Sequence, residues 1–518
     1  MAIFSPLRLS QLLLPVAATP VGLQHPIHHG ITWRPCGLGL NETAPMSCGS
    51  LAVPLDYTDT SSNKKLMLEL LKVDAVNSPS RGSILFNFGG PGASGKADLA
   101  YFAGMLLGAT GGQYDLVTFV PRGTGDTLTF SCYDSTEQRI FAALSNPVLS
   151  GNASDTALGR IWADSQVFSQ TCYTSQNKTG DLVGTAFAAR DMMQIVDALE
   201  EDGLLRFWGI SYGTVLGATT AAMFPERMDK VILDGVVNPF EYYSNQEVEL
   251  YKDTDKTFYG FCTGCVANPD KCVLAKENMT AAELEAKVYA FFEDLKYNPI
   301  VIPDPTASYV LDYSTVKPLM HRQLYAPQAW PSAAIVLNAL MTRDIETIAA
   351  IVAELAATPA MLDAEAQFGI KCGDTFGQTS NISDILPIVH ARHEASRYVG
   401  DTGDIVPMRC AQWKIPAKER YSGDFRVKTK NPMLVIGNTY DPATPLASAR
   451  NVSETFEGSV LLQQDGYGAS LCTAKTVRAY FVDGKLPDTD TICDVDIPLF
   501  SGSDGWDAVL EQLAADEE

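Results

Sequence analysis

The stretch 204–223, LLRFWGISYGTVLGATTAAM, decides the fold that this sequence predicts. Its apolar part, 205–210, is typical of a short buried strand, and small and apolar residues then continue at helical spacing to the end of the stretch. Strand, G-x-S-x-G and helix in this order is the context of a nucleophile elbow, which exposes a serine hydroxyl at a sharp turn. Because such a turn crowds the backbone, its neighbours Gly209 and Gly213 must lack side chains. An ordinary turn of small residues is the alternative, but the flanking elements favour Ser211 as a nucleophile.

Further short apolar runs extend the pattern. Because they alternate with helical segments such as 192–203, they predict an α/β fold whose sheet is mostly parallel and covered by helices on both faces. Ligands of such sheets bind at the carboxyl ends of the strands, where Ser211 stands. We also expect an edge strand at 50–57, because an edge tolerates the missing N–H of Pro54. The other expected strands are 65–73, 83–88, 115–120, 230–235, 432–437 and 459–463.

From about residue 241 the alternation gives way to successive helices. One of them begins at a capping box, Thr280 with Glu283. We interpret this region as a helical lid inserted into the core, and lids of this kind exclude water and select substrates. The predicted organisation is a weak signal or N-terminal segment (1–30), the first part of the core (31–240), the lid (241–400) and the second part of the core with a cysteine-bearing end (401–518).

Composition excludes some classes of function. A chain of 518 residues with a formal net charge of −23 is acidic, whereas nucleic-acid binding requires a basic surface. No window holds the roughly 18 apolar residues of a membrane span. We therefore expect a small-molecule or peptide substrate, no nucleic acid, no membrane span, and neither a metal nor a cofactor.

Cysteines and glycosylation sequons indicate export. Eleven cysteines are many for a cytosolic chain, and their odd number leaves at least one thiol without a partner within the chain. The spacing of several cysteines suggests local disulfide bridges. The cysteines at 262, 265 and 272 form either a metal knuckle or a disulfide cluster, and the lack of a fourth ligand at zinc spacing favours the disulfide cluster. We expect a secreted glycoprotein. The expected bridges join Cys36 with Cys48, Cys132 with Cys172, and Cys472 with Cys493. The sequons stand at Asn41, Asn152, Asn177, Asn278, Asn381 and Asn451.

A serine nucleophile needs an oxyanion hole, an acid and a base. The amide of Tyr212 and an amide from the turn at Gly89 and Gly90 are the candidates for the oxyanion hole. Asp441 is the candidate acid, because it follows a late strand and the chain order of such enzymes is serine, acid, histidine. As an alternative, an Asp before Pro is a common turn residue.

Several stretches together resemble the tripeptidyl aminopeptidase-like branch of the α/β-hydrolases, which are relatives of the prolyl iminopeptidases. The resemblance runs from about Trp33 to about Phe500 and implies a secreted serine exopeptidase or related hydrolase, with Ser211 and Asp441 matching the nucleophile and the acid. The stretches that carry it are 87–95, 115–125, 209–217, 233–236 and 441–445.

The sequence departs from this family at two places. Val120 stands where the family has an Asp before Pro-Arg-Gly. The loop that carries the family's catalytic histidine reads DGYGASLC at 465–472, contains no histidine and is short near Ala469. The six histidines elsewhere do not obviously replace it. They are His25, His28, His29, His321, His390 and His393.

Loss of the base has a large expected effect. In a well-studied serine protease, removal of the histidine lowers turnover about a million-fold. The remaining rate is roughly 10³–10⁴ times that of the uncatalysed reaction in water. The sequence thus leaves three functions open: a hydrolase of peptide or other acyl bonds, a catalytically impaired ligand-binding protein, and an acyl-transfer or hydrolysis step in a biosynthetic pathway. It also leaves open whether the histidine is truly absent or belongs to a segment missing between Gly468 and Leu471.

Overall fold

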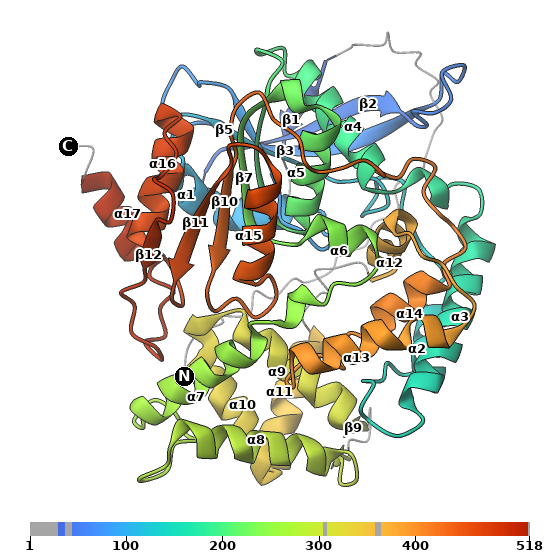
Figure 1. Ribbon diagram of the computed structural model, residues 1–518, viewed down its shortest axis with the longest axis vertical. Coiled ribbons are helices and arrows are strands. Elements are labelled where there is room, and N and C mark those ends of the chain that lie inside the picture. The colour runs from blue at the N-terminus through green and yellow to red at the C-terminus, as the bar shows by residue number, and fades with distance from the viewer. Residues whose placement is uncertain (1–29, 37–43, 304–307, 358–363, 516–518) are drawn as a thin grey trace, which may run out of the picture.

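The structure is a computed structural model that describes residues 30–36, 44–303, 308–357 and 364–515 (Figure 1). Its main element is a ten-stranded sheet in the order β1-β2-β3-β5-β4-β6-β7-β10-β11-β12. The first three strands are antiparallel, and β4 to β7 and β10 to β12 pair in parallel. This confirms the predicted α/β fold with a mostly parallel sheet. The bounds are β1 Thr32–Pro35, β2 Met46–Pro54, β3 Lys65–Val73, β4 Ser83–Asn87, β5 Asp115–Phe119, β6 Leu205–Ser211, β7 Met228–Val236, β10 Leu434–Asn438, β11 Val460–Asp465 and β12 Ile492–Asp494.

One prediction about the sheet was wrong. The strand expected at the edge, 50–57, is β2, and β1 lies outside it as the true edge. The pairing of β1 reaches only Ser50, so Pro54 at the end of β2 has a neighbour on one side alone. The missing N–H of Pro54 is therefore tolerated because no described strand pairs with β2 on that side at this residue. This holds at the end of β2 and not along the whole strand, since residues 47–50 are paired on both sides.

Helices cover both faces of the sheet, as alternation of the strand side chains requires. Phe207 of β6 packs into the core beneath α4 (Thr185–Ala198), α5 (Tyr212–Met223) and α15 (Leu446–Thr455). Its neighbour Trp208 packs into the opposite core beneath α1 (Lys96–Ala109) and α16 (Leu471–Asp483), beside α17 (Trp506–Ala515). The parallel strands are thus buried on both faces.

A helical region lies between β7 and β10 (Figure 1). Its capping box is formed: Thr280 and Glu283 exchange hydrogen bonds at the start of α8. The expectation of helices alone was incomplete, because a short hairpin, β8 (Ile300–Ile302) with β9 (Tyr309–Leu311), follows α8. The helices are α6 Pro239–Tyr243, α7 Thr254–Ala267, α8 Ala281–Leu295, α9 Tyr313–Leu324, α10 Trp330–Thr342, α11 Ile345–Ala357, α12 Ala364–Asp374, α13 Leu386–Ala395 and α14 Ile405–Ala411. Helices α7 to α11 share a hydrophobic core of their own, whereas α6, α12, α13 and α14 pack into the core beneath α5. Outside this region, α2 (Thr136–Ser145) and α3 (Ala157–Gln176) precede α4.

Five disulfides join ten of the cysteines. Three are the bridges expected from spacing. Cys265 pairs with Cys272, which is the disulfide alternative to a metal knuckle and leaves Cys262 as a buried free thiol. The fifth bridge, between Cys372 and Cys410, joins α12 to α14 and was not predicted. Among the residues that the structure describes, no helix is both long and apolar enough to cross a bilayer.

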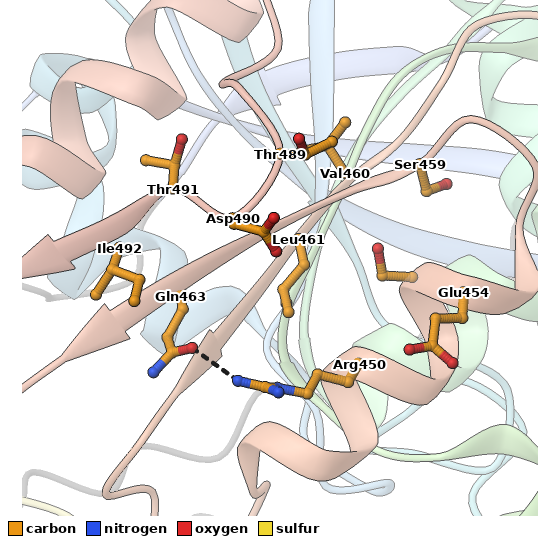
Figure 2. Close-up of a pocket in the computed structure, with 11 residues that line it drawn as sticks. Arg450, Glu454, Ser459, Val460, Leu461, Gln463, Thr489, Asp490, Thr491 and Ile492 are labelled. Carbon is orange, nitrogen blue, oxygen red and sulfur yellow. Dashed lines mark hydrogen bonds between the residues drawn. The ribbon is translucent and has the colours of Figure 1, made fainter.

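The C-terminal edge of the sheet carries a cavity of about 320 Å³ between α15, β11 and the segment before β12. Figure 2 shows Arg450 of α15 reaching Gln463 of β11, where its Nη2 donates to Oε1 at 3.0 Å. Neither Ser211 nor Asp441 lines this cavity.

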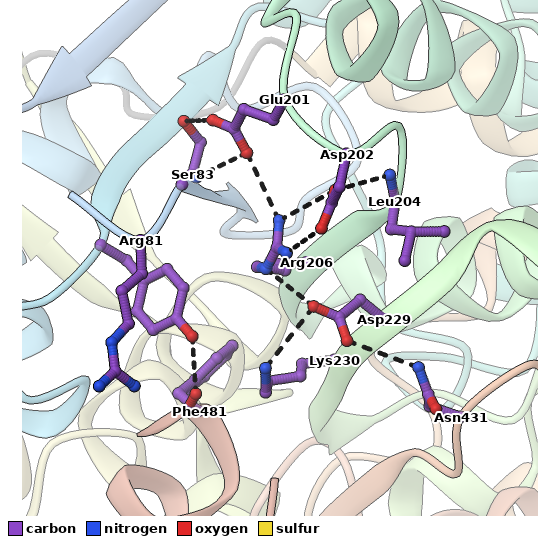
Figure 3. Close-up of polar contacts among 12 residues, drawn as sticks. Arg81, Ser83, Glu201, Asp202, Leu204, Arg206, Asp229, Lys230, Asn431 and Phe481 are labelled. Carbon is purple, nitrogen blue, oxygen red and sulfur yellow. Dashed lines mark hydrogen bonds and ion pairs between the residues drawn. The ribbon is translucent and has the colours of Figure 1, made fainter. Parts of the chain in front are cut away.

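A cluster of charges closes the amino ends of the parallel strands (Figure 3). Arg206 at the start of β6 forms ion pairs with Glu201, Asp202 and Asp229 of β7. Glu201 also accepts hydrogen bonds from the backbone and hydroxyl of Ser83 in β4. These contacts fix three neighbouring strands at the ends opposite to Ser211.

The family's Asp before Pro-Arg-Gly is replaced by a fully buried Val120, yet the adjacent Arg122 is completely paired. Its Nε and Nη2 each lie 2.7 Å from a carboxylate oxygen of Asp191, and Tyr57 donates to the same carboxylate at 2.7 Å. The remaining guanidinium donors bind three backbone carbonyls. Both side chains of the ion pair are 0% exposed, so this pair anchors the loop after β5.

Candidate active site

The predicted elbow is present at the end of β6. Ser211 has φ 57° and ψ −124°, a backbone conformation that side chains rarely adopt, and α5 begins at the next residue. A Cβ on Gly209 would lie 2.3 Å from the carbonyl oxygen of Gly213, and one on Gly213 would lie 2.2 Å from that of Asn87. Both glycines are therefore required by close backbone contact, as the sequence indicated.

The glycine turn after β4 lies directly against the serine. A Cβ on Gly89, which has φ +101°, would come within 2.8 Å of the Ser211 Cβ and 3.2 Å of its Oγ. The Gly89 amide donates to Asn87 Oδ1 at 3.1 Å, so it is already occupied. Gly90, which lines the cavity beside Ser211, and Tyr212, in the first turn of α5 where amides lack helical acceptors, remain as candidate oxyanion donors.

Asp441 lies in the loop after β10 and is held in one orientation. Its Oδ1 accepts hydrogen bonds from the amides of Ala443 (2.8 Å) and Thr444 (2.7 Å), and its Oδ2 accepts from the Thr444 hydroxyl at 2.9 Å. Burial raises the pKa of Asp441, and these three hydrogen bonds partly oppose the rise. The carboxylate is thus fixed by its own loop, and no histidine in the described ranges hydrogen-bonds to it.

The sheet brings the elbow and the acid loop together, because β6, β7 and β10 are neighbours and parallel. Gly235 near the end of β7 lies between them. A Cβ there would be 3.1 Å from Thr444 Oγ1 and 3.9 Å from the Ser211 amide nitrogen. Ala443 and Thr444 also line the same cavity as Ser211.

The cavity at Ser211 encloses about 200 Å³ between the carboxyl ends of the strands and the helical region. Its charged lining comes from the helical region: Glu247, Lys371 of α12 and Arg392 of α13. Lys371 Nζ lies 3.0 Å from the Glu247 carboxylate. The serine hydroxyl makes no hydrogen bond to any residue in the described part of the chain.

A second cavity, of about 210 Å³, lies on the other side of the acid loop. It is lined by Asp441, Asp234 and the loop Gly468–Ser470, where the family's histidine is expected. Ala469 stands there instead. Burial raises the pKa of Asp234 to about 6, and the nearby charge of Asp441 contributes to the rise. Asp441 and Ala469 thus line one cavity, at the position where the resemblance implies a histidine.

His321 of α9 is a residue whose position the sequence did not reveal. Its Nε2 lies 2.9 Å from the carbonyl oxygen of Pro442, so it donates that hydrogen bond, and burial lowers the pKa of His321 to about 4. His393 instead pairs with Asp404 at 2.7 Å, and His390 is exposed on α13. The three N-terminal histidines lie outside the described residues. Within the described ranges, no histidine hydrogen-bonds to Ser211.

A parallel sheet covered on both faces, with a strained serine between β6 and α5 and an acid after β10, defines an α/β-hydrolase fold. The C-terminal part of the chain, residues 396–493, matches the family model described as TAP-like protein. That segment contains both Asp441 and the loop at Ala469.

Three relatives extend the similarity over most of the chain. A protein named tripeptidyl aminopeptidase from Streptomyces lividans is 24% identical over 490 residues, covering 90% of this chain and 86% of the relative. The serine protease Hip1 of Mycobacterium tuberculosis is 28% identical over 493 residues, covering 89% and 91%. The putative hydrolase YuaR of Escherichia coli is 23% identical over 503 residues, covering 88% and 92%.

Among solved structures, a 2-hydroxy-6-oxo-6-phenylhexa-2,4-dienoate hydrolase from Rhodococcus aligns with a TM-score of 0.34 at 12% identity, covering 91% of this chain and 98% of that one. The sequence relatives confirm the predicted resemblance to the tripeptidyl aminopeptidase-like proteins and the predicted class, a serine hydrolase.

Proposed function

We propose that this chain cleaves peptide or other acyl bonds through attack by Ser211 Oγ on a carbonyl carbon. The amides of Tyr212 and Gly90 would stabilise the developing oxyanion, and Asp441 is the acid of the site. The observation that carries the proposal is the strained Ser211, which lines a cavity and lies against the Gly89 turn. Two relatives are named tripeptidyl aminopeptidase and serine protease, which supports short peptides as the substrate class.

The helical region 241–400 is proposed as the lid of this site. It contributes Glu247, Tyr325, Lys371 and Arg392 to the cavity at Ser211, so it forms the wall opposite the sheet. A wall of this kind excludes water and limits which substrates reach the serine. The small volume of the cavity favours short or terminal segments of a peptide.

We also propose that the protein acts outside the cytosol. Five disulfides in the described residues support this, because such bonds persist in oxidising compartments.

A second candidate function, a ligand-binding protein with little catalysis, is favoured by one observation. Ala469 stands where the base is expected, and a cavity lies between it and Asp441. Without a base, Ser211 retains only the assistance of the oxyanion hole and of substrate positioning.

Labelling with a fluorophosphonate probe, together with hydrolysis of peptidyl and simple ester chromogenic substrates, separates the two. The hydrolase proposal expects stoichiometric labelling and turnover that Ser211→Ala abolishes and Ser61→Ala, an exposed serine, leaves unchanged. Equal rates for wild type and Ser211→Ala would refute it. Absence of labelling with retained ligand binding would favour the second candidate.

A further inference from the structure

One charged group in the cavity at Ser211 has unused hydrogen-bond donors. Arg392 on α13 lines this cavity and is 1% exposed. Its Nη2 donates to the carbonyl oxygen of Gly403 at 2.9 Å and to the hydroxyl of Tyr251, whose ring lies 4.6 Å from the guanidinium carbon. Nε and Nη1 are buried and have no hydrogen-bond partner among the residues that the structure describes. The side chain is therefore held in place through Nη2, while the donors on Nε and Nη1 are buried without a partner in the described chain.

The charge of Arg392 is also unbalanced. The other two charged groups of the cavity, Lys371 and Glu247, pair with one another at 3.0 Å. In the described ranges no carboxylate lies within ion-pair distance of Arg392. Asp404 acts on it from farther away. The Oδ2 of Asp404 lies 2.7 Å from His393, its Oδ1 is buried without a hydrogen-bond partner in the described residues, and burial raises the pKa of Asp404 against the opposing effects of His393 and Arg392. Among the charged side chains that line the cavity, Arg392 is thus the one without a carboxylate at ion-pair distance in the part of the chain that the structure describes.

A buried guanidinium without a counter-charge is costly, because burial removes its hydration and the hydrogen bonds of Nη2, together with the Tyr251 ring contact, return only part of the lost interaction. Such a group is stable when a ligand supplies the opposite charge, and carboxylates match the guanidinium in charge and in planar geometry. The neighbouring phenols of Tyr212 and Tyr325 do not supply it, since burial raises the pKa of both and keeps them neutral.

We propose that Arg392 binds a carboxylate of the substrate, so that this site prefers acyl compounds or short peptides with a carboxylate close to the scissile bond. The position of that carboxylate relative to Ser211 rests on the proposed function. The cavity of about 200 Å³ has room for a few atoms around the carboxylate and not for a folded chain. The carboxylate is either the terminal α-carboxylate of a short peptide or an acidic side chain.

The test measures binding, so it needs no catalysis. Isothermal titration calorimetry on the full-length Ser211→Ala protein would compare acetyl-Ala-Ala with its carboxamide, and acetyl-Glu-amide with acetyl-Gln-amide. Since a hydrogen bond to a charged group contributes more than a neutral one, the carboxylate member of one pair should bind about 10- to 100-fold more tightly. The pair that shows the preference identifies the source of the carboxylate.

Variants then assign the preference to this residue. Arg392→Gln should abolish it, and Arg392→Lys, which keeps the charge with fewer donors, should retain part of it. Arg397→Gln is the control, because Arg397 is exposed two residues after the end of α13, packs over Tyr289 and does not line the cavity. If Arg392→Gln does not fold, Arg392→Lys and the two ligand pairs on the Ser211→Ala protein decide the question.

Each result has a distinct meaning. No preference in either pair, no binding of any probe up to millimolar concentration, or a preference that persists unchanged in the Arg392 variants overturns the inference. Fluorophosphonate labelling of Ser211 without a carboxylate preference leaves the proposed hydrolase standing and removes only the inference. A preference that depends on Arg392 without labelling supports the inference and removes the hydrolase.

Discussion

Replacing Ala469 with histidine is expected to raise the turnover of this protein about 10²- to 10⁴-fold, the range typical of a general base. Ala469 lies with Asp441 on the wall of a cavity of about 210 Å³, which is roughly seven times the volume of a water molecule in the liquid. Ala469 is 6% exposed and packs with Ala474, Val509 and Leu513, so the prediction is that an imidazole here turns into the cavity that it shares with Asp441. Removal of the histidine from a well-studied serine protease lowers kcat about 10⁶-fold. A catalytic group misplaced by about 1 Å gives a rate about 10²-fold lower than the well-placed group, so the expected gain is smaller than about 10⁶.

The expected pH dependence follows from the same carboxylates. An imidazole accepts the serine proton only when it is neutral, so activity should rise with pH through its pKa. Asp441 and Asp234 line the cavity, and their negative charges favour the imidazolium and move that pKa above its usual value of about 6.5. The assay is kcat/KM for a peptidyl chromogenic substrate from pH 5 to 9, compared between wild type and Ala469→His.

The matched control is Ala469→Asn, which introduces a polar side chain of similar size that cannot take up a proton at these pH values. Ala469→His with Ser211→Ala should be inactive if the serine is the group that the histidine activates. If Ala469→His has the same Tm and the same substrate binding as wild type but is no faster than Ala469→Asn, the reasoning about the missing base is refuted.

Three further predictions concern the elbow, the buried ion pair and the second acid. Gly89→Ala should slow fluorophosphonate labelling of Ser211 at least 10-fold, because the new Cβ would lie 2.8 Å from the serine Cβ in a strained backbone conformation. Asp191→Ala should lower the free energy of unfolding in urea by about 3–5 kcal/mol, since Arg122 would be left buried and unpaired. Asp234 has its pKa raised to about 6, so the folded state retains its proton up to higher pH than the unfolded chain does. The free energy of unfolding of wild type, relative to Asp234→Asn, should therefore fall as pH rises from about 4 to 6.

Each of these predictions has an internal comparison. Gly377→Ala also places a side chain at a positive φ, +89°, but meets nothing within 4 Å, so it should label at the wild-type rate. Tyr57→Phe removes one hydrogen bond from Asp191 and should cost only about 1 kcal/mol. If it costs as much as Asp191→Ala, the ion pair is not what holds this loop. An Asp234→Asn protein with the same pH profile of stability as wild type would contradict the raised pKa.

The parts of the fold that the sequence predicted are those set by neighbours in the chain. The strand and helix around Ser211, the required glycines at 209 and 213, and the capping box at Thr280 each depend on a few consecutive residues. Three disulfides were also predicted. Two of them join cysteines only 12 and 21 residues apart, but the third spans 40 residues, so short spacing accounts for two of the three.

The parts that could not be predicted depend on contacts between distant segments. Asp191, which pairs with Arg122, lies 69 residues away on α4, and His321, which binds the carbonyl of Pro442, lies 121 residues before it. The Cys372–Cys410 bridge was missed although its separation, 38 residues, is no longer than that of the predicted Cys132–Cys172 bridge. Arg392 looked like an ordinary helix residue beside two histidines. Its open donors become visible only when α13 is placed over the carboxyl ends of the strands, 181 residues after Ser211 in the chain.

The acid loop is held in shape by contacts of its own, independently of any histidine. In a complete triad the histidine is a main hydrogen-bond partner of the acid, so its loss would be expected to leave a buried carboxylate poorly satisfied. Here Asp441 is bound by Thr444 through both backbone and hydroxyl and by the amide of Ala443, all from its own loop. Because these contacts are local, the acid stays in place whether or not an imidazole fills the cavity beside it. A base supplied at Ala469 should therefore act on a site that is already built, with no rearrangement of the acid.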